Sequence, residues 1–134
     1  MTEASDLNGL TLLGGKVEPD RKLETFPNHH PDRPYIVRFE TDEFTCICPA
    51  TGQPDFAHIT VEYLPADKIL ESKSFKLYLW SFRNEGVFHE HVTNVILDDL
   101  VKALDPHWCR VSSKFNVRGG IVITVEAEHD EREE

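Results

Sequence analysis

The chain has 134 residues, the size of a single domain with one modest hydrophobic core. Lysine and arginine total 14 against 24 aspartates and glutamates, which gives a net charge of −10. This charge repels nucleic-acid backbones and anionic lipids, so we expect neither as a partner, and any bound anion must meet a local group of cations. No apolar run could span a membrane and the first residues lack the features of a signal peptide, which together predict a cytoplasmic protein.

The first 33 residues are interrupted by prolines and glycines and show little periodicity. We therefore predict an N-terminal extended arm over residues 1–33, followed by a single domain over residues 34–129. Residues 130–134 are predicted to form an acidic tail.

The predicted domain begins with alternating segments. Residues 35–40 (YIVRFE) and 43–48 (EFTCIC) alternate apolar and polar side chains, and the turn-prone pair Thr41-Asp42 lies between them. This pattern predicts an antiparallel hairpin. Residues 57–64 (AHITVEYL) repeat the alternation, which predicts a third strand.

After Pro65 the apolar spacing changes to that of helices. Residues 72–84 and 88–104 each carry an apolar stripe, and we predict a helix in each. Asp105 precedes a proline and is expected to end the second helix. The stripes consist of Phe75, Leu79 and Phe82 in the first segment and Val92, Ile96, Leu97, Leu100, Val101 and Leu104 in the second.

The last part of the domain alternates again. Residues 108–117 and 120–128 are predicted as strands, and Arg118-Gly119-Gly120 marks a hairpin between them. The whole order predicts an α+β fold, with two helices on one face of an antiparallel sheet. A sheet this small leaves two edges that must be covered or paired, and pairing between subunits would solve that problem.

Three cysteines in no disulfide-scaffold spacing favour a reducing compartment. Cys46 and Cys109 fall in alternating patterns and are expected in the core. Cys48 instead ends a predicted strand beside a segment rich in turn formers, where a thiol can meet a ligand. Asp55 follows across that loop. A thiolate with a nearby proton donor can add to a multiple bond and protonate the atom that becomes anionic.

Each of these two residues also has a structural explanation. Cys48 could be a small buried apolar residue, and Asp55 could organise the turn. The residues alone do not decide between these roles and the catalytic ones.

Residues 88–92 (FHEHV) begin the second predicted helix. Glu90 falls in its first turn, where the helix dipole favours a carboxylate, so helix capping is one explanation. The other is that Glu90 binds two adjacent N–H donors, such as those of the guanine edge. His89 and His91 point in different directions around a helix and make a poor chelating pair. No zinc-site spacing is present, so no metal site is predicted.

Residues 71–78 (ESKSFKLY) resemble the signature of the NADPH-dependent 7-cyano-7-deazaguanine reductases, the nitrile reductases of queuosine biosynthesis, and all eight positions fit. Further blocks are similar in order and spacing, so the resemblance covers nearly everything from Pro34 onward. These blocks are CPATGQPDF (48–56), SFRNEGVFHE (81–90), DP (105–106) and RGG (118–120).

The resemblance implies the tunnelling fold (T-fold), in which subunits join their sheets into a barrel. It also implies NADPH-dependent reduction of the nitrile of 7-cyano-7-deazaguanine to an aminomethyl group through a covalent thioimide. By position, Cys48 resembles the nucleophile and Asp55 the acid that protonates the nitrile nitrogen. Glu90 resembles the carboxylate that anchors the purine, and His89 is implied to line the same pocket.

The same resemblance implies a second set of binding residues. Glu71, Ser72, Lys73 and Ser74 are similar to residues that contact substrate and NADPH. Lys76 and Arg118 are implied to contact the cofactor alone. Lys73, Lys76 and Arg118 would supply the local positive potential that the phosphates of NADPH need on an acidic protein.

Length and motif content resemble the short, single-module members of the family. The resemblance implies a ring-based homo-oligomer, a decamer of two pentamers. Some short members carry a cysteine two residues after the anchoring glutamate, but here that residue is Val92, so a disulfide with Cys48 is excluded at that position. Two other functions stay open, namely a zinc-dependent hydrolase like GTP cyclohydrolase and a non-catalytic purine-binding module.

Overall fold

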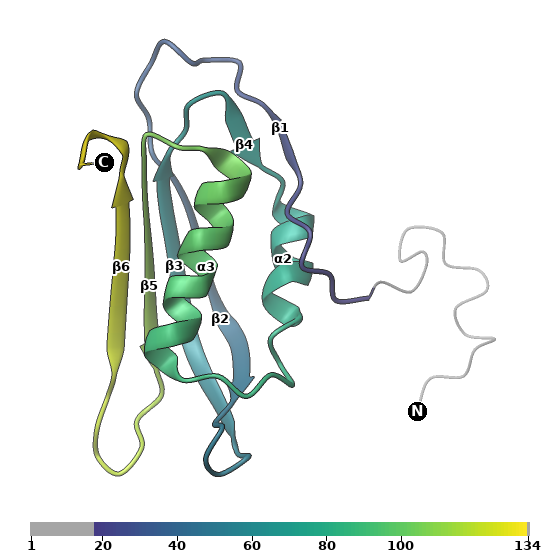
Figure 1. The fold of residues 1–134 in the computed structure, drawn as a ribbon, viewed down its shortest axis with the longest axis vertical. Helices are drawn as coiled ribbons and strands as arrows, with labels where there is room; N and C mark the ends of the chain where they lie inside the picture. Colours follow the sequence, from purple (N-terminus) through teal and green to yellow (C-terminus); the bar gives the residue numbers. More distant parts are fainter. Residues whose placement is uncertain (1–17, 134) are drawn as a thin grey trace, which may run out of the picture.

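Two helices cover one face of a four-stranded antiparallel sheet (Figure 1). The structure is a computed structural model that describes residues 18–133. The strand order is β2-β3-β5-β6, and a separate two-stranded sheet pairs β1 with β4. The predicted α+β layout is confirmed. The elements are β1 (Thr25–Pro27), β2 (Val37–Ile47), β3 (Pro54–Leu64), β4 (Lys68–Leu70), α2 (Ser72–Trp80), α3 (His89–Leu104), β5 (Trp108–Phe115), β6 (Thr124–Asp130) and the 3₁₀ turn η1 (Glu131–Glu133).

The predicted hairpin around Thr41-Asp42 is wrong, because β2 is one continuous strand. Thr41 pairs with Ile59 and Phe44 pairs with Ala57, so the ladder shifts by one residue between these two pairs. This β-bulge places an extra residue in β2 and reverses which side chains face the helices. Phe39 faces α2 before the bulge, and Phe44 is buried after it.

The second hairpin is confirmed, although β6 begins four residues later than the predicted strand, at Thr124 instead of residue 120. Gly119 and Gly120 have φ values of 57° and 77°. Such left-handed conformations at both central residues fit a tight hairpin turn, which glycine adopts without strain. The backbone N–H groups of Arg118 and Ile121 each donate to the carbonyl of the other, at 2.9 Å.

Both predicted helices form. The first ends at Trp80, earlier than its apolar stripe suggests, but Phe82 in the turn that follows is still buried. The second ends at Asp105, as predicted, where a left-handed residue caps the helix. In Figure 1, α3 lies in front of the sheet between β5 and α2, and α2 lies near β2. Helix α3 packs mainly against β5 and β6.

The hydrophobic core lies between the helices and the covered face of the sheet. Cys46 and Cys109 are fully buried in it, as predicted. Thr93 and Ser113 are also fully buried, and their hydroxyl oxygens lie 3.0 Å apart, which links α3 to β5 by a satisfied polar contact. The largest buried apolar side chains of the sheet and helices include Phe44, Ile59, Val61, Tyr63, Tyr78, Ile96, Leu100, Leu104 and Val111.

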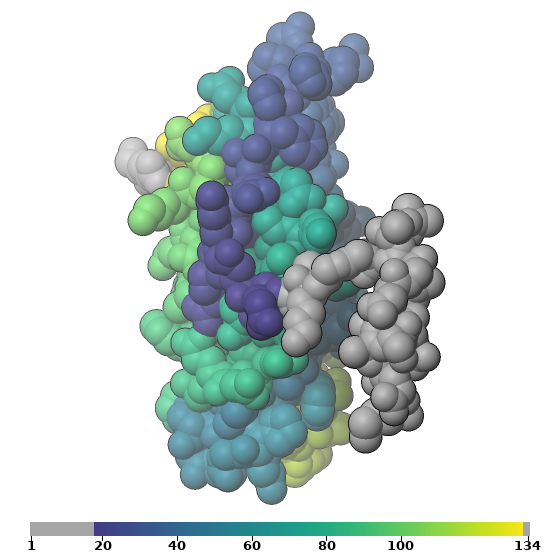
Figure 2. Space-filling view, turned by 90° about the vertical axis from the view of Figure 1, so that its right-hand side faces the viewer, coloured from purple at the N-terminus to yellow at the C-terminus, as the bar shows by residue number. Residues whose placement is uncertain are grey.

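Residues 18–27 of the N-terminal arm run along α2, and residues 28–33 continue into the loop at the upper end of the molecule (Figure 2). The N–H of Glu24 donates to the Ser74 hydroxyl at 3.0 Å, and β1 pairs with β4. Residues 1–17 of the predicted arm and the last residue of the predicted tail lie outside the described residues. The domain boundaries at residues 33 and 129 stay predictions.

Within residues 18–133, no helix is long and apolar enough to cross a membrane.

Ile96 provides a test of the core. It is fully buried between α3 and the sheet, whereas Asp98 on the same helix is exposed. Replacing Ile96 by alanine should lower the free energy of unfolding by about 2–5 kcal/mol, because it removes buried methyl groups and leaves a cavity. The control Asp98→Ala should change it by no more than about 0.5 kcal/mol. Urea titrations at one protein concentration would measure both values, and equal midpoints for the two variants would contradict this placement of α3.

Candidate active site

Cys48 lies directly after β2, at the start of the turn that leads into β3. The Cys48 N–H donates to the carbonyl of Gln53, and the N–H of Gly52 donates to the carbonyl of Cys48, both at 2.9 Å. Gly52 has a φ of 73°, which favours glycine at this position. The turn therefore closes around Cys48 and directs donors at its sulfur.

The surroundings of Cys48 favour the thiolate. Hydrogen bonds from the Thr51 hydroxyl, then from the backbone N–H groups of Thr51 and Ala50, lower the pKa of the Cys48 thiol below its usual value. Burial and the nearby Asp55 carboxylate oppose this shift more weakly. The thiolate is the reactive form of cysteine, so this site holds an activated and half-buried sulfur.

The other cysteines have the opposite character. Burial, helped by the Asp55 carboxylate, raises the pKa of Cys46 to about 11. Burial raises the pKa of Cys109 to about 12. Both side chains are fully buried, so Cys48 is the thiol suited to react.

Asp55 lies in β3, so it does not organise the turn as one explanation suggested. It is only 5% exposed, and a buried carboxylate requires partners. The Nε2 atom of His89 lies 3.1 Å from its Oδ2 atom, and the Nη2 atom of Arg118 lies 3.1 Å from its Oδ1 atom. The structure thus brings together Cys48, Asp55, His89 and Arg118, which sequence reasoning assigned to different roles.

His89 is held in a fixed orientation. Its ring stacks on Phe115 with centroids 3.7 Å apart and an interplanar angle of 6°. The Thr93 hydroxyl donates to the His89 carbonyl at 2.8 Å, which fixes the first turn of α3. Sequence reasoning missed Phe115 as a site residue, since its alternation indicated only a core position.

Glu90 is exposed in the first turn of α3, as predicted. The residue at the helix cap is Phe88, and no side chain caps this end by a hydrogen bond. Within residues 18–133 the Glu90 carboxylate makes no hydrogen bond or ion pair, whereas its backbone carbonyl accepts a hydrogen bond from the Asn94 side chain. Its oxygens are therefore available to a ligand.

The segment Glu71–Lys76 divides into structural and exposed residues. The Glu71 carboxylate accepts hydrogen bonds from the N–H groups of Lys73 and Ser74, at 2.8 and 2.7 Å, and so caps α2. These bonds lower the pKa of Glu71. Ser74 is buried, and its hydroxyl donates to the Glu71 carbonyl at 2.9 Å. Sequence reasoning assigned both residues to ligand binding and missed the cap, because glutamate is not among the usual N-cap residues.

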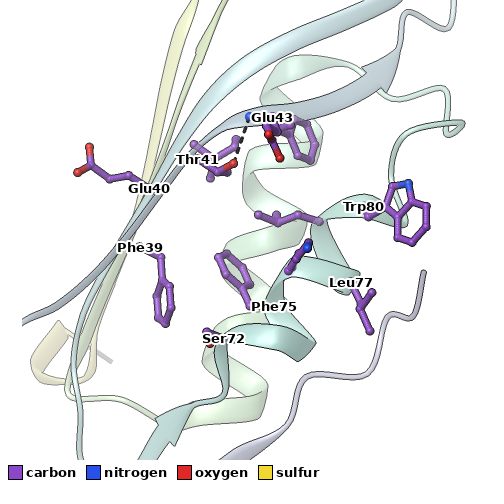
Figure 3. A pocket seen from close by; sticks show the side chains of 12 residues that line it. Phe39, Glu40, Thr41, Glu43, Ser72, Phe75, Leu77 and Trp80 are labelled. Carbon is purple, nitrogen blue, oxygen red and sulfur yellow. Dashed lines mark hydrogen bonds between the residues drawn. The ribbon is translucent and has the colours of Figure 1, made fainter. Parts of the chain in front are cut away.

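A cleft of about 540 Å³ separates α2 from β2 (Figure 3). Ser72 and Lys76 line it together with apolar side chains such as Phe39, Phe75 and Trp80. Ser72, Lys73 and Lys76 are all exposed, so they can contact a ligand.

A second cleft of about 500 Å³ shares Glu43, Leu79 and Trp80 with the first. It continues to Gly52 and Pro54 in the loop after Cys48 and also includes Arg83. The two clefts are therefore adjacent, and the second reaches the loop that follows Cys48, although Cys48 itself lines neither.

Among residues 18–133, no group of three or more histidine, cysteine, aspartate or glutamate side chains is arranged to hold a metal ion.

Comparisons with known proteins agree with these features. A family model described as "QueF-like protein" matches residues 54–134. An NADPH-dependent 7-cyano-7-deazaguanine reductase of Syntrophus aciditrophicus (strain SB) is 68% identical over 128 residues, which are 96% of this chain and 91% of that protein. A protein of the same name from Anaeromyxobacter sp. (strain Fw109-5) is 59% identical over 115 residues, covering 86% of this chain and 94% of that protein.

One solved structure is also similar. The crystal structure of the archaeosine synthase QueF-Like in the apo form matches with a TM-score of 0.67 and 28% identity. The match covers 72% of this chain and 94% of that chain.

The Thr51 hydroxyl provides a test of thiol activation. Replacing Thr51 by valine should raise the pKa of Cys48 and slow its alkylation by iodoacetamide at neutral pH, because the largest stabilising contact to the thiolate is lost. The matched control Thr51→Ser keeps the hydroxyl and should react nearly as fast as the natural protein. Peptide mass spectrometry across a pH series would measure the rate at Cys48 alone. Identical pH profiles for the valine and serine variants would refute the role of the hydroxyl.

Proposed function

Because the chain belongs to the family of the NADPH-dependent 7-cyano-7-deazaguanine reductases, we propose that it reduces the nitrile of 7-cyano-7-deazaguanine to an aminomethyl group, with Cys48 as nucleophile. This is the nitrile reduction of queuosine biosynthesis, on the tunnelling fold of the family. The observation that carries the mechanism is the Cys48 sulfur, held by donors that favour the thiolate beside a buried carboxyl group.

The first step forms a covalent bond between Cys48 and the substrate. The Cys48 thiolate attacks the nitrile carbon, one π bond of the C≡N group opens, and its electron pair moves to nitrogen. Asp55 donates a proton to that nitrogen, and the product is a neutral thioimide. The His89 imidazole, 3.1 Å from Asp55, is placed to return a proton to the carboxylate.

The later steps return the thiolate. Two molecules of NADPH, bound one after the other, would each supply one hydride to the carbon. After the first reduction the carbon–sulfur bond breaks, and Cys48 leaves as a thiolate while the substrate becomes an imine. The donors from Thr51 and Ala50 that favour the thiolate also favour this departure. Two protons and two hydrides in total convert the nitrile to the amine.

Glu90 suits recognition of the purine ring. Its two oxygens can accept from the two adjacent N–H donors of a guanine-like edge. His89 points toward Asp55, whereas Glu90, one residue further around α3, is exposed. We propose that the purine lies between this end of α3 and a neighbouring subunit.

Ser72, Lys73 and Lys76 fit a site for NADPH. The two ammonium groups can contact phosphates, and the cleft beside Ser72 and Lys76 offers apolar and aromatic walls to a ring system. Glu71 and Ser74 contribute by holding the start of α2 in place. The adjacent second cleft, which reaches Gly52 and Pro54, gives the cofactor a path toward the loop that follows Cys48.

We also propose that the chain assembles into a ring-based homo-oligomer, a decamer of two pentamers, in the cytoplasm. Apart from a single bridge between Ile47 of β2 and Gly86, the outer sides of β2 and β6 have no strand partner within residues 18–133. Exposed apolar side chains on the hairpin between β5 and β6, Val117, Ile121 and Val122, support contact with another subunit.

Adduct formation tests the proposed reaction. Incubation with 7-cyano-7-deazaguanine and no NADPH should add the mass of one substrate to the natural chain, because thioimide formation needs no hydride. The adduct should be absent in Cys48→Ser. It should be present in Cys109→Ala, because burial raises the pKa of the Cys109 thiol and keeps it in the unreactive protonated form. Intact-mass spectrometry measures the result.

Each other outcome of that experiment overturns the proposal. Substrate that binds without a covalent adduct would indicate a purine-binding module. Turnover that is lost to chelators, with no adduct, would indicate a zinc-dependent hydrolase.

The two lysines test the cofactor site. Lys73→Ala and Lys76→Ala should each raise the apparent KM for NADPH by about tenfold, because a hydrogen bond to a charged group contributes about 1.5–3 kcal/mol. The rate of adduct formation without NADPH should be unchanged. The control Lys102→Ala removes an exposed lysine from the last turn of α3. It should alter neither the KM for NADPH nor the rate of adduct formation. Steady-state kinetics with varied NADPH measures the KM, and an unaltered KM in both variants would refute this site.

A further inference from the structure

Arg118 lies at one end of the tight hairpin between β5 and β6. Its backbone N–H donates a hydrogen bond to the carbonyl of Ile121, and its carbonyl accepts one from the N–H of Ile121. Gly119 and Gly120 are the two central residues of the turn. The backbone at Arg118 is therefore fixed, and the side chain extends from a rigid base.

The guanidinium group of Arg118 reaches three successive residues of the segment that follows Cys48. Its Nη1 atom donates to the Gln53 side-chain oxygen at 3.2 Å, and its Nη2 atom donates to the carbonyl of Pro54. The same Nη2 atom lies 3.1 Å from Oδ1 of Asp55. Gln53 also accepts, through its carbonyl, the N–H of Cys48. One side chain thus connects the hairpin to both catalytic residues. In Figure 2 the loops around residues 50 and 118 lie together at the lower end of the molecule.

The two oxygens of Asp55 have partners of different chemistry. Arg118 faces Oδ1 and His89 faces Oδ2. An arginine guanidinium keeps its protons under physiological conditions, whereas an imidazole can exchange one. Arg118 therefore acts as a fixed anchor on one oxygen, and proton exchange is left to the other. Cys46 and Cys48 at the end of β2 also lie near Asp55, since its charge acts to raise the pKa of both thiols.

The two partners of this ion pair differ in exposure. Asp55 is 5% exposed, whereas the Arg118 side chain is 43% exposed, so water screens the pair from the arginine side. Removing the guanidinium would leave the buried carboxyl group with His89 as its one remaining charged partner, and Oδ1 would lose the contact that holds it.

We propose that Arg118 is a positioning residue for thioimide formation, which holds the Asp55 carboxyl group and the Cys48 turn in reactive geometry before any cofactor binds. This inference rests on the proposed nitrile reduction. It differs from the role implied by family resemblance, in which Arg118 contacts cofactor phosphate. The contacts of Arg118 are with the catalytic turn, and none is with Lys73 or Lys76 of α2.

The test measures the adduct step and the cofactor step separately. Arg118→Gln should slow adduct formation with 7-cyano-7-deazaguanine, in the absence of NADPH, by about 10- to 100-fold, the effect expected when a reacting group is misplaced by about 1 Å. Arg118→Lys keeps a charge and should recover part of that loss. Arg33→Gln removes an exposed arginine elsewhere and controls for net charge. Rapid quenching followed by intact-mass spectrometry gives the rates.

A double-mutant cycle asks whether Arg118 acts through Asp55. In an Asp55→Asn background, Arg118→Gln should have little further effect on the adduct rate, because the group that it positions is already lost. Additive losses would overturn the inference. So would a natural adduct rate in Arg118→Gln together with a raised KM for NADPH, since that pattern belongs to a phosphate contact.

Two controls keep the result interpretable. If Arg118→Gln fails to fold, as judged by circular dichroism, Arg118→Lys carries the same cycle with Asp55→Asn, and additive losses there overturn the inference equally. If the natural chain forms no adduct, the proposed function fails instead, which is a separate outcome visible without any Arg118 variant.

Discussion

The site depends on the burial of one carboxyl group. Asp55 is almost fully covered, and such a group is stable only with partners, which here are His89 of α3 and Arg118 of the hairpin between β5 and β6. Three parts of the chain must therefore meet before Asp55 is satisfied. The contacts of Asp55 with His89 and Arg118 therefore stabilise the fold and also hold the residues of the candidate site together.

Residues that stabilise the fold also lie beside exposed polar residues at the start of α2. Glu71 uses its carboxylate to cap the helix, and buried Ser74 ties the cap to the N-terminal segment. The exposed residues between and after them, such as Lys73 and Lys76, are left to bind. A motif that looks like one set of ligand contacts in the sequence thus combines a rigid support with the groups that it presents.

Sequence patterns predicted the fold class, both helices and the second hairpin, because each depends on local periodicity or turn residues. They failed at Thr41-Asp42, where the inward positions change from odd to even numbers. A turn and a β-bulge both produce that change, and only the pairing of Thr41 with Ile59 and of Phe44 with Ala57 decides between them. Local propensity carries no information about such distant pairing.

The site shows the same division. Residue type and position next to a turn identified Cys48 and Asp55 as candidates, whereas the contact between Asp55 and Arg118 joins β3 to the hairpin between β5 and β6, far away in the sequence. The activation of Cys48 by Thr51 is local but depends on the backbone of the turn, which residue types alone do not specify. Candidate residues could thus be named from the sequence, with their catalytic roles still predictions, whereas the contacts that hold the thiol and the carboxyl group follow only from the fold. Asp55 lies in β3 and is held by His89 of α3 and Arg118 of the hairpin. A change in any of these elements should therefore move the Asp55 carboxyl group and alter the surroundings of the Cys48 thiol.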